Sequence, residues 1–319
     1  MKHRTMLQMA ILVALGLGVL FSLVAFDQPG RQDTELLEVS VIIREAESTG
    51  WSAARQGMEQ AAADLGAELR FLTLSLPNSA EEQRSLLTRE VEGGADAVVL
   101  VPADPAALVD DVKAAASHAA VITMESDMVD SGAEACISVD NAALGRALGL
   151  AALNGVPEGG EAVLVDSAPG SAGVSRRLAE AARVLEEAGR SVYLCTLSGG
   201  RSLAETLNAT LQARRPDAVV AFEPSALEQA ARLAQGQERP PLVYGTGATS
   251  TIASHLERSS ITLSAAQNEF AAGYLAVEAA VRSARGQTQA AIAPLAFSLI
   301  RQENMYDPDN QKLLFPVTR

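Results

Sequence analysis

Polar residues follow several apolar, strand-like runs of this sequence, and these are the places where chemistry could occur. Two such stretches, REAESTGW (44–51) and ESD (125–127), lie in the first half of the chain. Three more, DSAPGSAGVSRR (166–177), EPS (223–225) and GTGATS (245–250), lie in the second half. Each stretch alone is typical of a solvated loop. Because ligands bind beside the carboxyl ends of parallel strands, their shared position in both halves indicates a binding site.

Catalytic groups do not occur in a productive pattern. No serine lies in a G-x-S-x-G elbow, and YGTGATST (244–251) lacks both a third glycine in register and the lysine of a phosphate-binding loop. Cys136 and Cys195 lie in apolar runs, so we expect buried, inert thiols that are too far apart to bridge. Three histidines show no metal-ligand spacing: His3, His118 and His255. We therefore predict no catalytic residue, no metal, no cofactor and no enzymatic activity.

Composition excludes some further classes of protein. The chain has 319 residues, a formal net charge of -14 and 48% hydrophobic residues, which is typical of a globular protein with more than one domain. An acidic surface repels the phosphate backbone, so we expect no nucleic-acid partner. Two cysteines are too few for a disulfide framework.

The N-terminus carries an export signal. A basic flank (1–9) precedes an uncharged apolar run (10–26), and a polar tether (27–38) follows it. Leu23 stands two residues before Ala25, where a cleavage site needs a small residue, and no cysteine follows the run to carry a lipid. We therefore favour a retained transmembrane anchor over a cleaved signal, with the flank in the cytoplasm and the rest of the chain outside it.

Elements that could position the polar loops alternate regularly after the tether. Amphipathic helical runs separate most of the short apolar runs, and helix signals support them: Asp104 as an N-cap before Pro105, and Asp140 or Asn141 as the cap of another helix. This alternation predicts an α/β protein with mostly parallel sheets and helices on both faces. Strands are expected at 39–43, 68–74, 97–101, 120–125, 135–139, 161–167, 191–197, 218–223, 241–246, 261–267 and 295–302.

The alternation restarts at residues 139–141, which predicts two doubly wound lobes of similar size rather than one sheet. From Val39 to about Arg301 the sequence resembles the type I periplasmic binding proteins, in particular the ribose-binding group of sugar importers. The resemblance rests on the following segments: VSVII, GWSAARQGMEQAAADLGAEL, EVEGGADAVVLVPADPAAL, AVITMESD, ISVDNAALGRALG, DAVVAFEPSALEQAARL and SSITLSAAQNEFAAGYLAVEAAVRSARGQ.

The resemblance implies that a three-strand hinge joins the lobes and that the protein is a non-enzymatic monomer. Lobe 1 would comprise 39–139 and 268–296, and lobe 2 would comprise 140–267 and 297–319. The implied hinge positions are Val139, Asp140, Gln267 and Leu295. Closure about this hinge would bury a ligand in the cleft between the lobes.

The resemblance also implies candidate ligand-binding residues, carried over position by position. An aromatic residue that would stack on the ligand falls at Trp51, and the family's basic residue falls at Arg177, or at Arg176 if the register slips. The remaining expected ligand-binding residues are Glu47, Glu125, Glu223 and Gln267.

This chain departs from the family's pocket at several of those positions. Gly50 replaces an aromatic residue, Ser126 replaces an arginine and Gly247 replaces an aspartate. Charged hydrogen bonds of this kind are worth about 1.5–3 kcal/mol each, so we do not carry pentose specificity over. The acidic residues Glu47, Glu125 and Glu223 favour a cationic or amine-bearing ligand, or a polyol, whereas the family resemblance implies a sugar-like ligand.

Two functions follow from these expectations. The first is an extracytoplasmic receptor that captures a small polar ligand and delivers it to an ABC importer. The second is a membrane-tethered sensor that presents its open or closed state to a partner such as a sensor kinase. The genes beside this one would distinguish the two.

Overall fold

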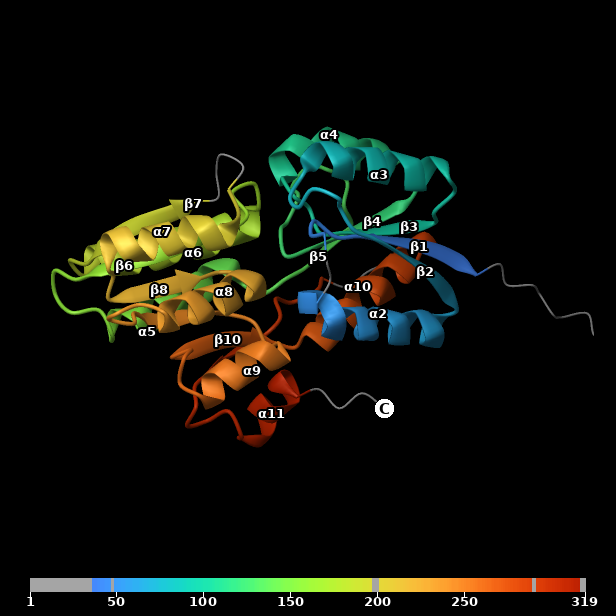
Figure 1. Ribbon diagram of the computed structural model, residues 1–319. Coiled ribbons are helices and arrows are strands. Elements are labelled where there is room, and N and C mark those ends of the chain that lie inside the picture. The colour runs from blue at the N-terminus through green and yellow to red at the C-terminus, as the bar shows by residue number, and fades with distance from the viewer. Residues whose placement is uncertain (1–35, 47–48, 197–200, 289–290, 316–319) are drawn as a thin grey trace, which may run out of the picture. The chain divides into compact units, whose positions relative to one another are not determined.

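Short, mostly apolar strands form two separate sheets, each covered by helices on both faces (Figure 1). The computed structural model describes residues 36–46, 49–196, 201–288 and 291–315. The expected basic flank, the anchor at 10–26 and nearly all of the tether therefore lie outside the described residues, as does Glu47. Across the described part of the chain, no helix is long and apolar enough to cross a membrane.

The first sheet is parallel throughout and has the order β2-β1-β3-β4-β5. Helices α2 (Ser52–Leu65) and α10 (Glu269–Ala284) pack on one face, and α3 (Ala80–Glu92) and α4 (Pro105–Ala115) pack on the other (Figure 1). A short turn of 3-10 helix, η1 (Thr49–Trp51), precedes α2. The strands are β1 (Leu37–Ile42), β2 (Ala67–Leu72), β3 (Ala97–Leu100), β4 (Ala120–Met124) and β5 (Ala135–Ile137).

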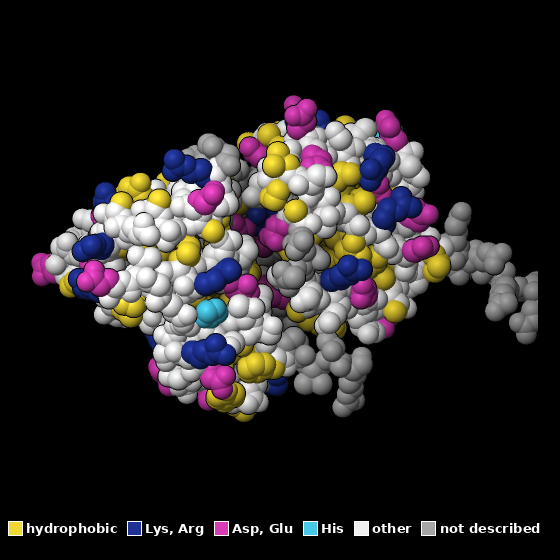
Figure 2. All heavy atoms as spheres, in the orientation of Figure 1, with side chains coloured by type: hydrophobic (Ala, Val, Ile, Leu, Met, Phe, Trp, Pro, Cys, Tyr) yellow, Lys and Arg dark blue, Asp and Glu magenta, His cyan; other side chains and the backbone are white. Residues whose placement is uncertain are grey.

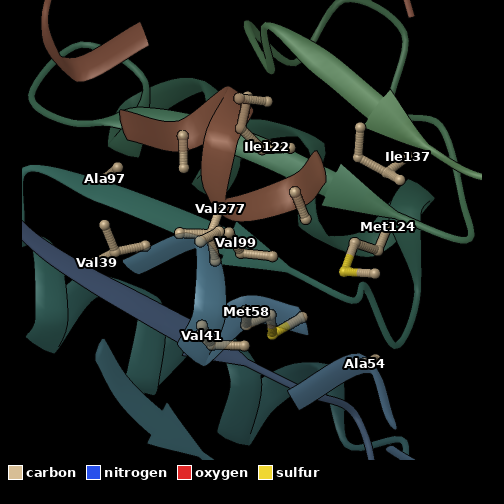
Figure 3. Packing of buried hydrophobic residues seen from close by; sticks show 14 of the residues in the cluster. Val39, Val41, Ala54, Met58, Ala97, Val99, Ile122, Met124, Ile137 and Val277 are labelled. Carbon is tan, nitrogen blue, oxygen red and sulfur yellow. The ribbon is translucent and has the colours of Figure 1, made fainter. Parts of the chain in front are cut away.

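Side chains that alternate along each strand fill the cores on both faces of this sheet. Val39 and Val41 point toward Met58 of α2 and Val277 of α10 (Figure 3), whereas Ile42 packs in the cluster under α3 and α4. Because both faces are covered, the strands need apolar residues at every position rather than at alternate ones. That requirement explains why the sequence shows continuous apolar runs such as AVVLV.

The second sheet has the order β11-β10-β9-β8-β6-β7 and is parallel except for β11, which runs antiparallel to β10. Helices α5 (Asn141–Leu153) and α6 (Ala172–Glu187) cover one face. The other face is covered by α7 (Leu203–Arg214), α8 (Pro224–Gln235), α9 (Ser250–Glu257) and α11 (Pro308–Leu314). The strands are β6 (Glu161–Asp166), β7 (Ser191–Thr196), β8 (Ala218–Ala221), β9 (Leu242–Thr246), β10 (Leu263–Gln267) and β11 (Phe297–Ile300).

Three segments connect the two halves of the fold. The first leads from β5 into α5 at residues 138–140, and the second leads from β10 into α10 at 267–269. The third enters β11, where Leu295 forms an isolated parallel bridge with Val139 and donates its backbone N–H to the Ser138 carbonyl at 2.9 Å. The predicted hinge residues thus lie at these connections, and their role as a hinge stays a prediction.

The α/β class with two parallel-sheet lobes is confirmed, and so are several local signals. Asp104 caps α4 by accepting from the Ala107 backbone N–H, and Pro105 occupies the first turn. Asp140, rather than Asn141, caps α5. The expected strand at 135–139 is too long: β5 ends at Ile137 because the next two residues pair with Leu295 instead.

Burial governs the chemistry of the two cysteines. Cys136 lies in β5 of the first sheet and Cys195 in β7 of the second, and both thiols are free. Burial raises the pKa of Cys136 to about 11 and also raises the pKa of Cys195. A thiol with a raised pKa is a poor nucleophile at neutral pH, which agrees with the expectation of inert cysteines.

Helices α5 and α6 approach each other closely at Gly145. A Cβ atom built on Gly145 would lie 2.1 Å from the carbonyl oxygen of Arg177, which is backbone and cannot rotate away. Gly145 therefore sets the distance between α5 and α6 and, with it, the position of Arg177 on the second sheet.

We predict that Gly145→Ala lowers the free energy of unfolding by about 1–3 kcal/mol, the usual effect of overpacking. Urea denaturation followed by circular dichroism measures this difference. Gly236→Ala is the matched control, because a Cβ there meets only an ordinary contact at 3.6 Å. Equal stability of the two variants would show that α6 shifts freely.

Candidate functional site

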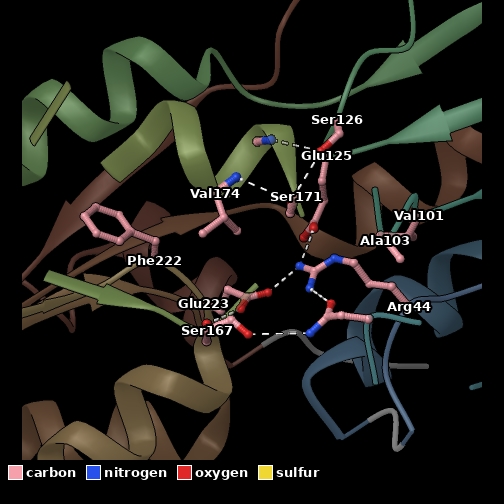
Figure 4. Close-up of polar contacts among 12 residues, drawn as sticks. Arg44, Val101, Ala103, Glu125, Ser126, Ser167, Ser171, Val174, Phe222 and Glu223 are labelled. Carbon is pink, nitrogen blue, oxygen red and sulfur yellow. Dashed lines mark hydrogen bonds and ion pairs between the residues drawn. The ribbon is translucent and has the colours of Figure 1, made fainter. Parts of the chain in front are cut away.

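Arg44 is the most deeply buried charged group between the two sheets. It follows β1, and its side chain is 2% exposed. Its guanidinium donates to Asn78 Oδ1 at 3.0 Å and to Glu125 Oε2 at 3.0 Å, both from the first lobe. It also forms an ion pair with Glu223, which follows β8 of the second sheet (Figure 4). One arginine therefore connects the two lobes.

Other hydrogen bonds hold Glu223 and its surroundings in place. The Ser167 hydroxyl, at the end of β6, donates to Glu223 (Figure 4). Asn78 Nδ2 lies 3.5 Å from the Ser167 carbonyl oxygen, which adds a second polar contact between the lobes. Because Ser167 and Glu223 follow neighbouring strands β6 and β8, the parallel order of the sheet brings them together.

Opposite charges keep Arg44 and Glu125 ionised despite burial. Burial alone would lower the pKa of Arg44, but Glu223 and Glu125 more than compensate, and the net pKa is raised. Burial alone would raise the pKa of Glu125, but Arg44 and Arg177 reverse this effect and the net pKa falls below its ordinary value. The arginine and Glu125 are therefore both charged at neutral pH.

Asn141 links the first lobe to Arg177 of the second. Its Nδ2 donates to the Glu125 carbonyl at 2.9 Å and to Ser138 Oγ at 3.1 Å, and its Oδ1 accepts from Arg177 Nε at 2.6 Å. Arg177 also donates from Nη1 to the Phe222 carbonyl at 3.0 Å and is only 5% exposed. Arg176 is exposed, so Arg177 is the arginine that the predicted site requires.

Ser126, where the resemblance places an arginine in the sugar-binding group, forms a contact between the lobes. Its hydroxyl accepts from the Gly173 backbone N–H at 2.9 Å, near the N-terminus of α6, and lies 3.4 Å from Ser171 Oγ. Ser126 is 2% exposed. A small hydroxyl at this position allows α6 to approach the first lobe, and a long side chain would prevent that approach.

A cavity of about 210 Å³ lies between the lobes, and acidic side chains are visible in the hollow there (Figure 2). Its walls come from loops after strands of both sheets, as parallel sheets predict. Its lining residues are Glu45, Gly50, Trp51, Glu125, Leu144, Arg177, Glu223, Pro224, Ser225, Glu228, Thr246, Gly247, Ala265, Gln267 and Glu269.

Two glutamates of this cavity have strongly raised pKa values. Burial, chiefly, raises the pKa of Glu45 to about 7, and the neighbouring charges of Glu223 and Glu125 add to the effect. Burial also raises the pKa of Glu269 to about 7, although Gln267 Nε2 donates to its Oε1 at 3.0 Å. The cavity therefore holds two carboxyl groups that change charge near neutral pH.

The structure brings five of the six predicted ligand-binding residues to this cavity, namely Trp51, Glu125, Arg177, Glu223 and Gln267. The sixth, Glu47, lies outside the described residues. That these side chains bind a ligand stays a prediction. Over the described ranges, no group of three or more His, Cys, Asp or Glu side chains could hold a metal ion.

Sequence reasoning overlooked several residues of the site. Arg44 and Glu45 lie in the polar stretch 44–51, but the resemblance marks only Trp51 and Glu47 there. A charged pair directly after an apolar strand is the signal that could have found them. The other overlooked residues are Asn78, Ser167, Glu228, Thr246 and Glu269.

The backbone explains why a glycine stands at position 247. Its φ is +134°, a conformation that side chains disfavour, and a Cβ there would lie 2.5 Å from Ile252 Cδ1. The Ser264 hydroxyl donates to the Gly247 carbonyl at 2.6 Å, which holds the loop in this conformation. This turn therefore presents backbone, rather than a carboxylate, to the cavity.

Comparisons with known proteins agree with this geometry. The sequence matches the model of the periplasmic binding protein domain over residues 39–288. A carbohydrate transporter solute-binding protein from Agrobacterium radiobacter, solved with D-arabinose, has a TM-score of 0.79 and 19% identity, covering 88% of this chain and 99% of that chain. A carbohydrate transporter from Acidothermus cellulolyticus, solved with myo-inositol, has a TM-score of 0.73 and 18% identity, covering 88% and 99%.

A further similar structure comes from a complex of two proteins. The XylFII–LytSN complex matches with a TM-score of 0.75 and 17% identity, covering 84% of this chain and 98% of the matched chain. A comparison with curated proteins found no match.

Two α/β lobes with a cavity between them form the architecture that this chain shares with the similar structures. The family match covers most of the chain and includes the strands of both sheets from Val39 onward except β11. This chain belongs to the periplasmic binding protein family.

We predict that Arg44→Met favours separation of the lobes. Without the guanidinium, Glu125 and Glu223 are left as buried charges, which destabilises the closed arrangement by about 3–5 kcal/mol. Opening the cavity hydrates both carboxylates, so small-angle scattering should give a larger radius of gyration than for the native chain. Arg84→Met is the control, because its partner Asp111 lies on the surface of the same lobe. An unchanged radius would show that other contacts hold the lobes together.

Proposed function

We propose that this protein captures a small polar solute, sugar-like or a polyol, outside the cytoplasm and delivers it to an ABC importer. The observation that carries the proposal is a cavity whose walls come from both lobes and hold charged, polar and aromatic side chains. A solute in this position contacts both lobes at once.

The size of the cavity supports a small solute. At about 210 Å³ it is smaller than pockets for drug-sized ligands, which span roughly 300–1,000 Å³. Proteins of the same fold are described with D-arabinose and with myo-inositol, a sugar and a polyol. The polar groups facing the cavity would orient hydroxyl groups, and the Trp51 ring would cover one apolar face of the solute.

Binding and closure would be coupled in the proposed mechanism. A solute that contacts Trp51 of one lobe and Arg177 of the other gains its full interaction energy only when the lobes close, so it shifts the population toward the closed state. The bound solute then stabilises the surface that the importer recognises. Because the side chains position the solute without reacting with it, the cycle is binding and release, not turnover.

A second candidate function is a sensor that presents its closed state to a partner protein. The XylFII–LytSN complex supports it, since a protein of this fold is described there with a second protein. Genes for a permease and an ATPase beside this gene would favour the importer, and genes for a kinase and a response regulator would favour the sensor.

Titration with solutes tests the proposed binding. Trp51 is the single tryptophan of the chain and lines the cavity, so its fluorescence reports on the site directly. We expect a saturable change in fluorescence when the full chain is titrated with at least one member of a panel of pentoses, hexoses and cyclitols. No change with any member, together with no heat in calorimetry, would contradict the proposal.

Trp51→Ala should weaken binding of the solute found in that panel by about 1–3 kcal/mol, because the ring no longer covers its apolar face. Isothermal titration calorimetry measures the loss without relying on fluorescence. Trp51→Phe is the matched variant and should retain most of the affinity, since an aromatic face remains. Equal affinity of the native protein and Trp51→Ala would show that Trp51 only closes the cavity wall.

A further inference from the structure

The interlobe cavity contains many more negative groups than positive ones. Five glutamates line it, at 45, 125, 223, 228 and 269, and Arg177 is the one arginine among its described lining residues. Arg44 lies behind the lining, where Glu125 and Glu223 already share its charge. A solute with only hydroxyl groups would leave this excess of negative charge uncompensated.

Donors in the cavity are also largely engaged by the protein itself. Arg177 donates from Nε to Asn141 and from Nη1 to the Phe222 carbonyl, and Gln267 donates to Glu269. Glu228 accepts from the Thr249 hydroxyl and also lines the cavity. The surface offered to a solute therefore consists mainly of acceptors, and it suits a solute rich in donors.

Two further polar atoms lining the cavity have no hydrogen-bond partner among the described residues. They are Thr246 Oγ1, at the end of β9, and Gln267 Oε1, at the end of β10. Thr246 is 5% exposed, so bulk water does not satisfy its hydroxyl group either. Buried polar atoms without partners are uncommon in native proteins, and their position points to a ligand group. This observation is independent of the acidic residues.

We propose that the solute of this cavity carries a protonated amine beside its hydroxyl groups, and that its ammonium group binds among Glu45, Glu269 and the unpartnered oxygens of Thr246 and Gln267. The inference rests on the proposed function, because it names the chemical class of the same solute. An ammonium group has three donors and no acceptor, which matches a wall of acceptors. The Trp51 ring, in the same lining, adds attraction for a cation.

The state of the two central carboxyl groups supports this assignment. Burial raises the pKa values of Glu45 and Glu269 to about 7, and each is affected by other charges that face it. Arg44 opposes the rise at Glu45 and Arg177 opposes it at Glu269, but neither arginine is sufficient to hold the pKa down. A bound cation supplies the missing positive charge and favours the ionised form of both groups.

Matched pairs of probes test the inference. The full chain is titrated by calorimetry at pH 8 with D-sorbitol and 1-amino-1-deoxy-D-sorbitol, and with myo-inositol and an aminodeoxy derivative of it. Each pair differs only by an amine in place of a hydroxyl. Within each pair, we expect the amine to bind at least about tenfold more tightly than the neutral compound, because one hydrogen bond between charged groups is sufficient for a difference of that size.

The dependence on pH gives a second measurement that requires no variant. At pH 8 Glu45 and Glu269 are mostly ionised, and at pH 6 they are mostly protonated, so the affinity for the amine should fall as the pH is lowered between these values. The other charged groups that face the cavity are Glu125, Glu223, Glu228 and Arg177, with Asp166 nearby. Arg44 keeps Glu125 ionised by lowering its pKa. Burial and the charge of Glu223 raise the pKa of Asp166. The neutral member of each pair should not lose affinity in this direction.

Two variants locate the effect. Glu45→Gln and Glu269→Gln keep the shape of the side chain and remove the charge, so each should reduce the preference for the amine by about tenfold. Glu68→Gln, at an exposed position on β2, is the matched control and should retain the preference. Thermal unfolding of each variant confirms that it is folded before titration.

The outcomes separate the inference from the function on which it rests. A neutral probe that binds as tightly as its amine partner, or an amine preference that survives both substitutions, overturns the inference and leaves a solute-binding protein for neutral ligands. No binding of any probe in these pairs or in the sugar panel counts against the proposed function and therefore against the inference as well.

Discussion

The ion pair between Arg44 and Glu223 is the interaction on which the rest of the site depends. It joins the end of β1 in one lobe to the end of β8 in the other, and Glu125 shares the same guanidinium. The packing of α5 on α6 places Arg177 nearby, and Asn141 connects that arginine to the first lobe. The cavity is therefore a product of how two independently packed sheets meet, and the acids that line it are balanced only in part.

Much of the fold could be predicted from the sequence because its signals are local. Continuous apolar strands, helix caps such as Asp104, and the restart of the pattern at Asp140 each depend on a few neighbouring residues. The end of β5 could not be placed in this way, because Val139 pairs with a residue more than 150 positions away along the chain. Long-range pairing of that kind leaves no periodic trace in either segment.

The site was predictable in outline and not in detail. The family resemblance, added to the polar loops after strands, was enough to select Trp51, Glu125, Arg177, Glu223 and Gln267, which line one cavity. It was not enough to separate ligand-facing groups from groups that hold the lobes together. Arg44 and Ser126 are of the second kind, since each is satisfied by partners in the opposite lobe. Only the three-dimensional structure shows which polar and charged side chains form hydrogen bonds or ion pairs within the protein.

The origin of α10 has a consequence for how the chain is made. This helix is encoded after the whole second sheet except β11, yet it covers one face of the first sheet together with α2. On the ribosome, the part of that face that α10 covers, around Val99 and Ile122, therefore stays exposed until residue 284 has been synthesised and released from the exit tunnel. The lobe whose strands come first therefore stays incomplete until most of the second lobe has been made, and an exposed apolar face is prone to aggregation during synthesis.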